Sequence, residues 1–231
     1  MFKMLAAVTV ALLFCSCRSS LMDQDYLTGR QWLRELDNKS FTGFYLASDR
    51  RLLLIDDFSE TGDQWAFKQD KLMLWKHTAR NPEPREYGFY YELDGRKLML
   101  RPDDGGDKLY FHDDRSAGAL DVAGWAACYV YNPDNLPAPV PGSIRMRFDG
   151  AAGQLKGSIG DKFFFGKYQL QPPVGIGITE LPEVGADTEE DRFLCHFLEL
   201  LESADTFLMV RETLILYRGT HVLAAFHASY Y

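Results

Sequence analysis

The side chains with the clearest potential for chemistry in this 231-residue chain are its four cysteines. Two of them lie two positions apart in LLFCSCRSS, residues 12–20. A thiol can pair in a disulfide, bind a metal ion or carry a covalent modification. Cys15 and Cys17 end an apolar run, whereas Cys128 and Cys195 lie singly in the second half. The first two therefore bear on the location of the protein, and the last two on its cross-linking.

The segment before the first two cysteines has the pattern of an export signal. Lys3 gives a positive start, and residues 4–14 form an uncharged run of roughly a dozen residues, the length of a signal-peptide core. A membrane-spanning helix needs ~20 apolar residues. We therefore expect export and removal of this segment, not a membrane span.

The end of this segment resembles the bacterial lipoprotein signal, in which a small residue precedes a cysteine that is acylated and becomes the new N-terminus. Ser16 before Cys17 fits that position, and the bulky Phe14 before Cys15 does not. The resemblance implies that Cys17 carries fatty acyl chains such as palmitate. Arg18 after it implies the periplasmic leaflet of the outer membrane. Phe14 departs from the usual Leu, and the alternative is an ordinary cleaved signal with two incidental cysteines.

Few other residues have a spacing that indicates a site. Cys128 lies in an expected strand and Cys195 on an expected helix, so they are a candidate disulfide in an oxidising compartment, with free thiols as the alternative. The five histidines follow no metal-binding spacing, and we expect no metal and no cofactor. No serine lies in a nucleophile elbow, and the acidic pairs lie at strand ends or turns. We therefore expect no enzymatic activity.

The charge balance argues against nucleic acid as a partner. The chain carries 25 Lys and Arg against 33 Asp and Glu, a formal net charge of −8. Removal of residues 1–16 takes away Lys3 alone and leaves 24 against 33, or −9. Nucleic-acid affinity depends largely on basic side chains that neutralise phosphates. This balance also gives the protein no electrostatic reason to lie against anionic lipid.

Short apolar runs separated by turn residues predict a mainly β (α+β) fold, with two antiparallel β-meander or barrel-like domains and one packed α-helix in the second. Asp94 and Gly95 form the sharpest hairpin signal. Thr188 is the expected helix N-cap, followed by three acidic residues. The predicted organisation is a signal peptide at 1–16, a tether at 17–25, an N-terminal β-rich domain at 26–115, a linker at 116–123 and a second domain at 124–231.

Six segments of the second half follow one another in an order known from a protein family. They are Gly124-Trp125, SIRMRFDGAAG, GSIGDKFFFGKYQL, VGIGITEL, TEEDRFLCHFLELL and DTFLMVRETLILYRG. This order, over about residues 120–228, resembles the META domain family, which includes the HslJ-like heat-shock lipoproteins. The resemblance implies a non-catalytic role in envelope integrity or stress tolerance.

One part of the second half departs from this family. Many members have Gly-Cys-Asn where this chain has GDK at 160–162, and the partner cysteine before the helix is missing too. We expect Phe163, Phe165 and Tyr168 to pack with the helix in place of that bridge, or Cys128 and Cys195 to supply another link. Alternation along a strand places Phe163 and Phe165 on one face and Phe164 on the other. Core packing is the expected role of these rings.

The first half weakly resembles lipocalins in its segment GRQWLREL, residues 29–36. It suggests a function other than the envelope role, namely ligand binding. Trp32, Trp65, Phe67 and Trp75 could line a site for a small apolar ligand, although core packing explains the same residues. The repeated pattern in DKLMLW, RKLMLR and ETLILY is the expected second strand of three hairpins, or a trace of duplication. The leading interpretation is a non-catalytic envelope lipoprotein. The alternatives are a binder of small hydrophobic ligands and an assembly factor that binds an envelope protein partner in the outer membrane.

Overall fold

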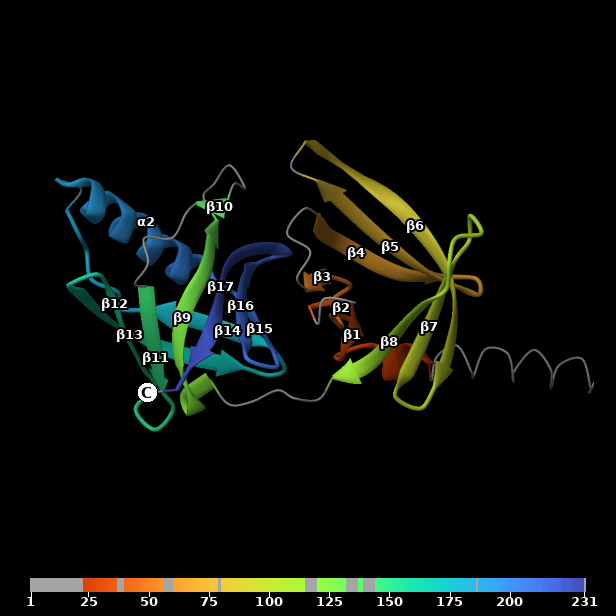
Figure 1. Cartoon of the computed structure of the whole chain (residues 1–231), viewed down its shortest axis with the longest axis horizontal. Helices are drawn as coiled ribbons and strands as arrows, with labels where there is room; N and C mark the ends of the chain where they lie inside the picture. The colour runs from red at the N-terminus through yellow and green to blue at the C-terminus, as the bar shows by residue number, and fades with distance from the viewer. Residues whose placement is uncertain are drawn as a thin grey trace, which may run out of the picture. The chain divides into compact units, whose positions relative to one another are not determined.

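The computed structural model describes residues 23–36, 40–55, 60–78, 80–114, 120–131, 137–138, 144–185 and 187–230. The chain divides into two compact units, unit 1 (Met1–Asp114) and unit 2 (Arg115–Tyr231), each built around a strongly curved antiparallel sheet (Figure 1). The mainly β architecture with one α-helix in the second half confirms the predicted fold class. Cys17 lies outside the described residues.

Unit 1 is an up-and-down barrel of eight strands. The strands are β1 (Gln31–Glu35), β2 (Phe41–Leu46), β3 (Leu52–Ile55), β4 (Thr61–Lys68), β5 (Lys71–Thr78), β6 (Asn81–Asp94), β7 (Lys97–Pro102) and β8 (Leu109–Asp114). The sheet order is β3-β2-β1-β8-β7-β6-β5-β4, and a single bridge between Arg51 and Gln64 joins its two ends. Each strand therefore has its sequence neighbours beside it, as in a closed meander.

The predicted hairpin at Asp94-Gly95 is confirmed. Asp94 pairs with Lys97 across the turn between β6 and β7, and Gly95 has φ of 56°. A positive φ is what a two-residue primed turn requires, because its backbone twist matches the twist of the strands. Turn chemistry thus sets the register of this part of the barrel.

Unit 2 repeats the meander and adds a helix. Its elements are η1 (Leu120–Val122), β9 (Gly124–Tyr131), β10 (Pro137–Ala138), β11 (Ile144–Asp149), β12 (Gln154–Ile159), β13 (Lys162–Gln171), β14 (Gly175–Thr179), α2 (Glu189–Ser203), β15 (Thr206–Val210), β16 (Thr213–Arg218) and β17 (His221–Ser229). The sheet runs β10-β9-β11-β12-β13-β14-β15-β16-β17, and β17 also pairs with β9, which closes the barrel. Strands β14 and β15 pair only at Gly175 and Thr206, and α2 connects them.

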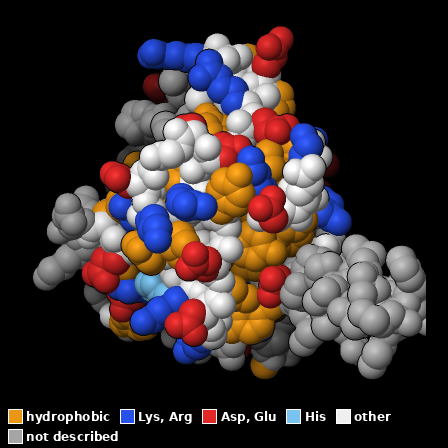
Figure 2. Space-filling view, turned by 90° about the vertical axis from the view of Figure 1, so that its right-hand side faces the viewer, with side chains coloured by type: hydrophobic (Ala, Val, Ile, Leu, Met, Phe, Trp, Pro, Cys, Tyr) orange, Lys and Arg blue, Asp and Glu red, His pale blue; other side chains and the backbone are white. Residues whose placement is uncertain are grey.

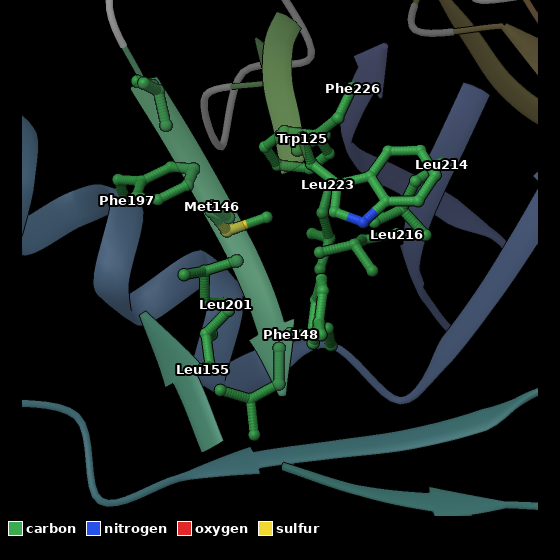
Figure 3. Packing of buried hydrophobic residues seen from close by; sticks show 14 of the residues in the cluster. Trp125, Met146, Phe148, Leu155, Phe197, Leu201, Leu214, Leu216, Leu223 and Phe226 are labelled. Atoms are coloured by element: carbon green, nitrogen blue, oxygen red, sulfur yellow. The ribbon is translucent and has the colours of Figure 1, made fainter. Parts of the chain in front are cut away.

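Helix α2 begins as its sequence predicts. The Thr188 hydroxyl accepts a hydrogen bond from the Asp191 backbone N–H, and the Asp191 carboxylate accepts one from the Thr188 backbone N–H, a reciprocal capping box. The buried face of the helix consists of Leu194, Phe197, Leu198 and Leu201. These side chains join Met146, Phe148 and Leu155 from the strands in one core (Figure 3).

A tryptophan in the first strand of each unit fixes the segment before it. The fully buried Trp32 indole N–H donates to the Leu27 carbonyl at 3.1 Å, and the equally buried Trp125 N–H donates to Leu120 at 2.9 Å. Residues 23–27, partly inside the predicted tether, are helical, and Leu27 is buried in the core of unit 1. Part of the predicted linker at 116–123 likewise belongs to unit 2, because Leu120 and Ala123 lie in its core; residues 115–119 lie outside the described residues.

Candidate binding surface

The sequence-predicted ligand lining of unit 1 falls into two groups. Trp32, Trp65 and Phe67 lie in or against the interior cluster of the barrel, whereas Trp75 is half-buried and outside that cluster. Trp75 follows the inward-facing Leu74 on β5, so strand alternation turns its side chain to the other face. The structure therefore does not bring the four rings together, which corrects the predicted set.

The interior rings of unit 1 contact one another. The Trp65 and Phe67 ring centroids lie 5.8 Å apart, and Phe67 lies 5.3 Å from Tyr91. The Trp65 N–H donates to the Ala47 carbonyl at 2.9 Å. Burial raises the pKa of Tyr91 to about 12, with a further contribution from Asp23, whose carboxylate accepts its hydroxyl hydrogen bond. An eight-stranded barrel is just wide enough for such side chains to fill it, so this packing favours a structural role.

The candidate cysteine pair is not joined in the structure. Cys128 on β9 and Cys195 on α2 are both free and half-buried. The Cys128 thiol contacts the Ala126 carbonyl, and the Cys195 thiol contacts the Glu199 carboxylate, each at 3.7 Å. Burial raises the pKa of both thiols, and Glu199 adds to the effect at Cys195. Both thiols are therefore poor nucleophiles at neutral pH. Within the described ranges, no three His, Cys, Asp or Glu are placed to hold a metal ion, and no helix combines the length and apolarity of a membrane span.

The link between β13 and α2 differs from the expected one. Phe163 and Phe165 do not pack with the helix: their side chains are 74% and 60% exposed, while Phe164 is fully buried. The Phe164 ring lies edge-on to Phe197 of α2, with centroids 5.9 Å apart. An ion pair between Lys162 and Asp191 joins the same two elements. The Lys162 hydrogen bond, then that of Thr188, lowers the pKa of Asp191.

The two exposed phenylalanines form one wall of a hollow of about 590 Å³ on the outer face of unit 2. Across the paired strands, Phe163 lies opposite Ser158, and Phe165 lies opposite Lys156. We define the aromatic–basic groove by the exposed aromatic and basic side chains that line it, namely Phe163, Phe165, Tyr230, Arg145, Arg147 and Lys156. Small residues, including Gly124 and Ser158, also line this hollow.

Strand alternation explains the composition of the groove. On β11, Met146 and Phe148 point into the core toward Leu155 and Leu201, as Figure 3 shows. Arg147 lies between them in sequence and Arg145 comes directly before Met146, so both arginines are exposed on the opposite face. Arg147 lies directly opposite Lys156 on β12. The groove is thus the outer side of the same strands that build the core.

Sequence reasoning missed this site because three consecutive phenylalanines leave open which face is inside. A signal that resolves the question lies in the tight turn at Gly160-Asp161, which places Ile159 opposite Lys162. Paired residues share a face, and alternation from the buried Ile159 then puts Phe164 inside and its two neighbours outside.

No family model and no curated protein matches the chain. Among solved structures, the chain is similar to a DUF4847 family protein from Bacteroides vulgatus ATCC 8482. The TM-score is 0.38 and the sequence identity 14%, over 48% of this chain and 94% of that chain. A likeness of this size supports no conclusion about the function of this chain.

Proposed function

We propose that the protein is a non-catalytic lipoprotein of the bacterial cell envelope, anchored through Cys17, whose unit 2 binds a partner at the aromatic–basic groove in support of envelope integrity or stress tolerance. The observation that carries this proposal is the exposure of Phe163 and Phe165 beside the basic side chains of the groove. Exposed apolar side chains within a polar rim mark interaction sites on soluble domains. The lipoprotein-like signal and the META-like order of elements support the envelope setting.

The chemistry of the groove suits binding and not proton transfer. Its ionisable side chains are two guanidinium groups, one ammonium group and the Tyr230 phenol. None of these is a histidine or a carboxylate, the side chains that most often serve as general acids and bases. General acid–base catalysis instead depends on groups with pKa values near the working pH.

A deletion strain complemented with defined variants tests this function. Without the gene, we expect greater sensitivity to detergents and hydrophobic antibiotics, which the wild-type gene restores. We expect Cys17→Ala to release the protein into the soluble fraction and to abolish palmitate labelling, and Phe163→Ser/Phe165→Ser to remain anchored but fail to complement. Tyr110→Ser, at a 63% exposed side chain of unit 1, is the matched control and complements fully.

Two results would contradict the proposal. An unchanged phenotype of the deletion strain in every condition would remove the envelope role. Full complementation by Phe163→Ser/Phe165→Ser would remove the groove from it. Crosslinking of a partner to unit 1 and not to unit 2 would instead assign the binding role to the first barrel.

A further inference from the structure

The aromatic–basic groove differs in charge from the rest of the chain. The face of the molecule in Figure 2 shows acidic and basic side chains interspersed, as on an ordinary protein surface. Among the residues that the structure describes, no Asp or Glu lines the groove, although acidic residues outnumber basic ones along the chain. Three basic side chains and three exposed aromatic rings thus share one hollow. This composition selects a ligand that is both anionic and apolar.

The pairing of the basic residues indicates that an anion stabilises the groove. Arg147 and Lys156 are direct cross-strand neighbours, and like charges in that arrangement are destabilising. Asp121 and Asp149 line an adjoining hollow of about 460 Å³ that shares Arg147 and Lys156. Within the described residues, however, no ion pair joins either carboxylate to these two basic side chains. Arg145 and the two phenylalanines line the groove and do not line the adjoining hollow that holds these acids.

The charges nearest the groove matter more for a bound anion than the net charge of the whole chain. The mature chain is acidic overall, but charges in physiological salt are screened beyond a Debye length of ~8 Å. Neighbouring strands lie ~4.8 Å apart, so the phenylalanines of β13 and the basic residues of β12 and β11 lie within about 10 Å across the sheet. The charges nearest a phosphate in the groove are therefore the three positive charges of Arg145, Arg147 and Lys156 and the two negative charges of Asp121 and Asp149 in the adjoining hollow, a local balance of +1.

We propose that the aromatic–basic groove docks on a bilayer surface containing anionic phospholipid. A headgroup phosphate sits between Arg145, Arg147 and Lys156, while Phe163 and Phe165 enter the adjoining interfacial layer. Phosphate and apolar chain are neighbours in a phospholipid, as basic and aromatic side chains are neighbours across β11, β12 and β13. Amphipathic protein surfaces bind such membranes by combining apolar burial with attraction to anionic headgroups. The inference rests on the proposed envelope function, because a lipid anchor would hold unit 2 near this surface.

Vesicle co-sedimentation tests the inference with the mature full chain from residue 17, carrying Cys17→Ser so that no acyl chain contributes. We expect binding to vesicles of phosphatidylglycerol and phosphatidylethanolamine, and no binding to vesicles of phosphatidylcholine. The binding should weaken as salt rises from about 0.1 M to 1 M, because the Debye length shortens from ~10 Å to ~3 Å.

Two variants and two matched controls locate the binding on unit 2. Arg145→Gln/Arg147→Gln/Lys156→Gln is expected to weaken binding by about 100-fold, since each basic residue near an anionic surface contributes several-fold. Phe163→Ser/Phe165→Ser is expected to weaken it in both low and high salt. Lys97→Gln/Lys108→Gln/Arg192→Gln makes the same change of charge at exposed positions outside the groove, and Tyr110→Ser matches the aromatic change. Both controls should bind like the parent.

The parent's failure to bind anionic vesicles would overturn the inference, as would an equal loss of binding in the control with the same charge change. Crosslinking of a protein to the groove, without vesicle binding, would also overturn it while leaving the proposed envelope function intact. Conversely, vesicle binding with full complementation by the phenylalanine variant would contradict the proposed function and keep the lipid site. The melting temperature of each variant confirms folding, and the single changes Phe163→Ser and Arg147→Gln serve in place of a multiple variant that does not fold.

Discussion

Gly157→Ala is a direct test of the packing that holds the groove in place. A Cβ atom at this position would lie 2.2 Å from Phe164 Cζ and 2.8 Å from the Arg145 carbonyl oxygen. Ordinary contacts begin near 3.4 Å, so the Phe164 ring would have to shift by about 1 Å. Phe164 is fully buried and packs edge-on against Phe197, which leaves it little room. The methyl group should therefore overpack the core.

Overpacking of this kind lowers the free energy of unfolding by about 1–3 kcal/mol. For a unit of about 100 residues, that loss corresponds to a decrease in melting temperature of roughly 5–15 °C. Calorimetry on the full chain measures it. Gly177→Ala is the matched control, because a Cβ there meets nothing within 4 Å, and it should stay within about 1 kcal/mol of the parent. Gly157→Ala/Phe164→Leu should recover part of the loss. Equal melting temperatures for the Gly157 and Gly177 variants would refute the packing explanation.

Three further predictions concern the ion pairs and the thiols. The buried Asp113 carboxylate lies 2.7 Å from the Arg30 guanidinium, so Asp113→Ala leaves Arg30 without this ion pair and should lower the free energy of unfolding by about 3 kcal/mol in urea denaturation. Asp107→Ala, at an exposed position, is the control and should have little effect. Lys162→Gln should raise the pKa of Asp191 toward its ordinary value in an NMR titration. Because the folded parent has a lowered Asp191 pKa, the parent should be more stable than the variant above about pH 4, and this difference should vanish as the pH falls through the Asp191 pKa of the folded parent. The unacylated mature chain with Cys17→Ser should show two free thiols by intact mass and slow alkylation at pH 7, since burial raises both thiol pKa values; a mass lower by two hydrogen atoms would show a disulfide instead.

Much of the fold follows from local signals in the sequence. The hairpin at Asp94-Gly95 and the helix start at Thr188 are set by the backbone chemistry of a few adjacent residues, and both form as predicted. The runs DKLMLW, RKLMLR and ETLILY are, as expected, second strands of hairpins, in β5, β7 and β16. Such features are predictable because their causes lie within one turn or one strand pair.

Features that depend on distant partners were not predictable in the same way. The described helical residues 23–27 are mostly polar, and the buried Leu27 accepts a hydrogen bond at its carbonyl from the indole of Trp32 in β1. Phe163 and Phe165 look like core residues until the register with β12 assigns the inner face to Phe164. Trp75 looks like a partner of Trp65 until alternation along β5 separates them. In each case the missing information was a strand register or a tertiary hydrogen bond.

The two units share one plan and differ where the groove lies. Each barrel closes through eight strands, with the two-residue β10 as an additional edge strand in unit 2. The first strand of each carries a buried tryptophan hydrogen-bonded five residues back, at Leu27 and at Leu120. Counted from those tryptophans and without β10, β7 and β16 are both seventh strands, which connects RKLMLR with ETLILY. Only unit 2 inserts a helix between its fifth and sixth strands. That helix takes Phe164 into the core through Phe197, and alternation then forces Phe163 and Phe165 into solvent. The exposed aromatic wall is thus a consequence of how unit 2 departs from the shared plan, which makes unit 2 the better place to look for function.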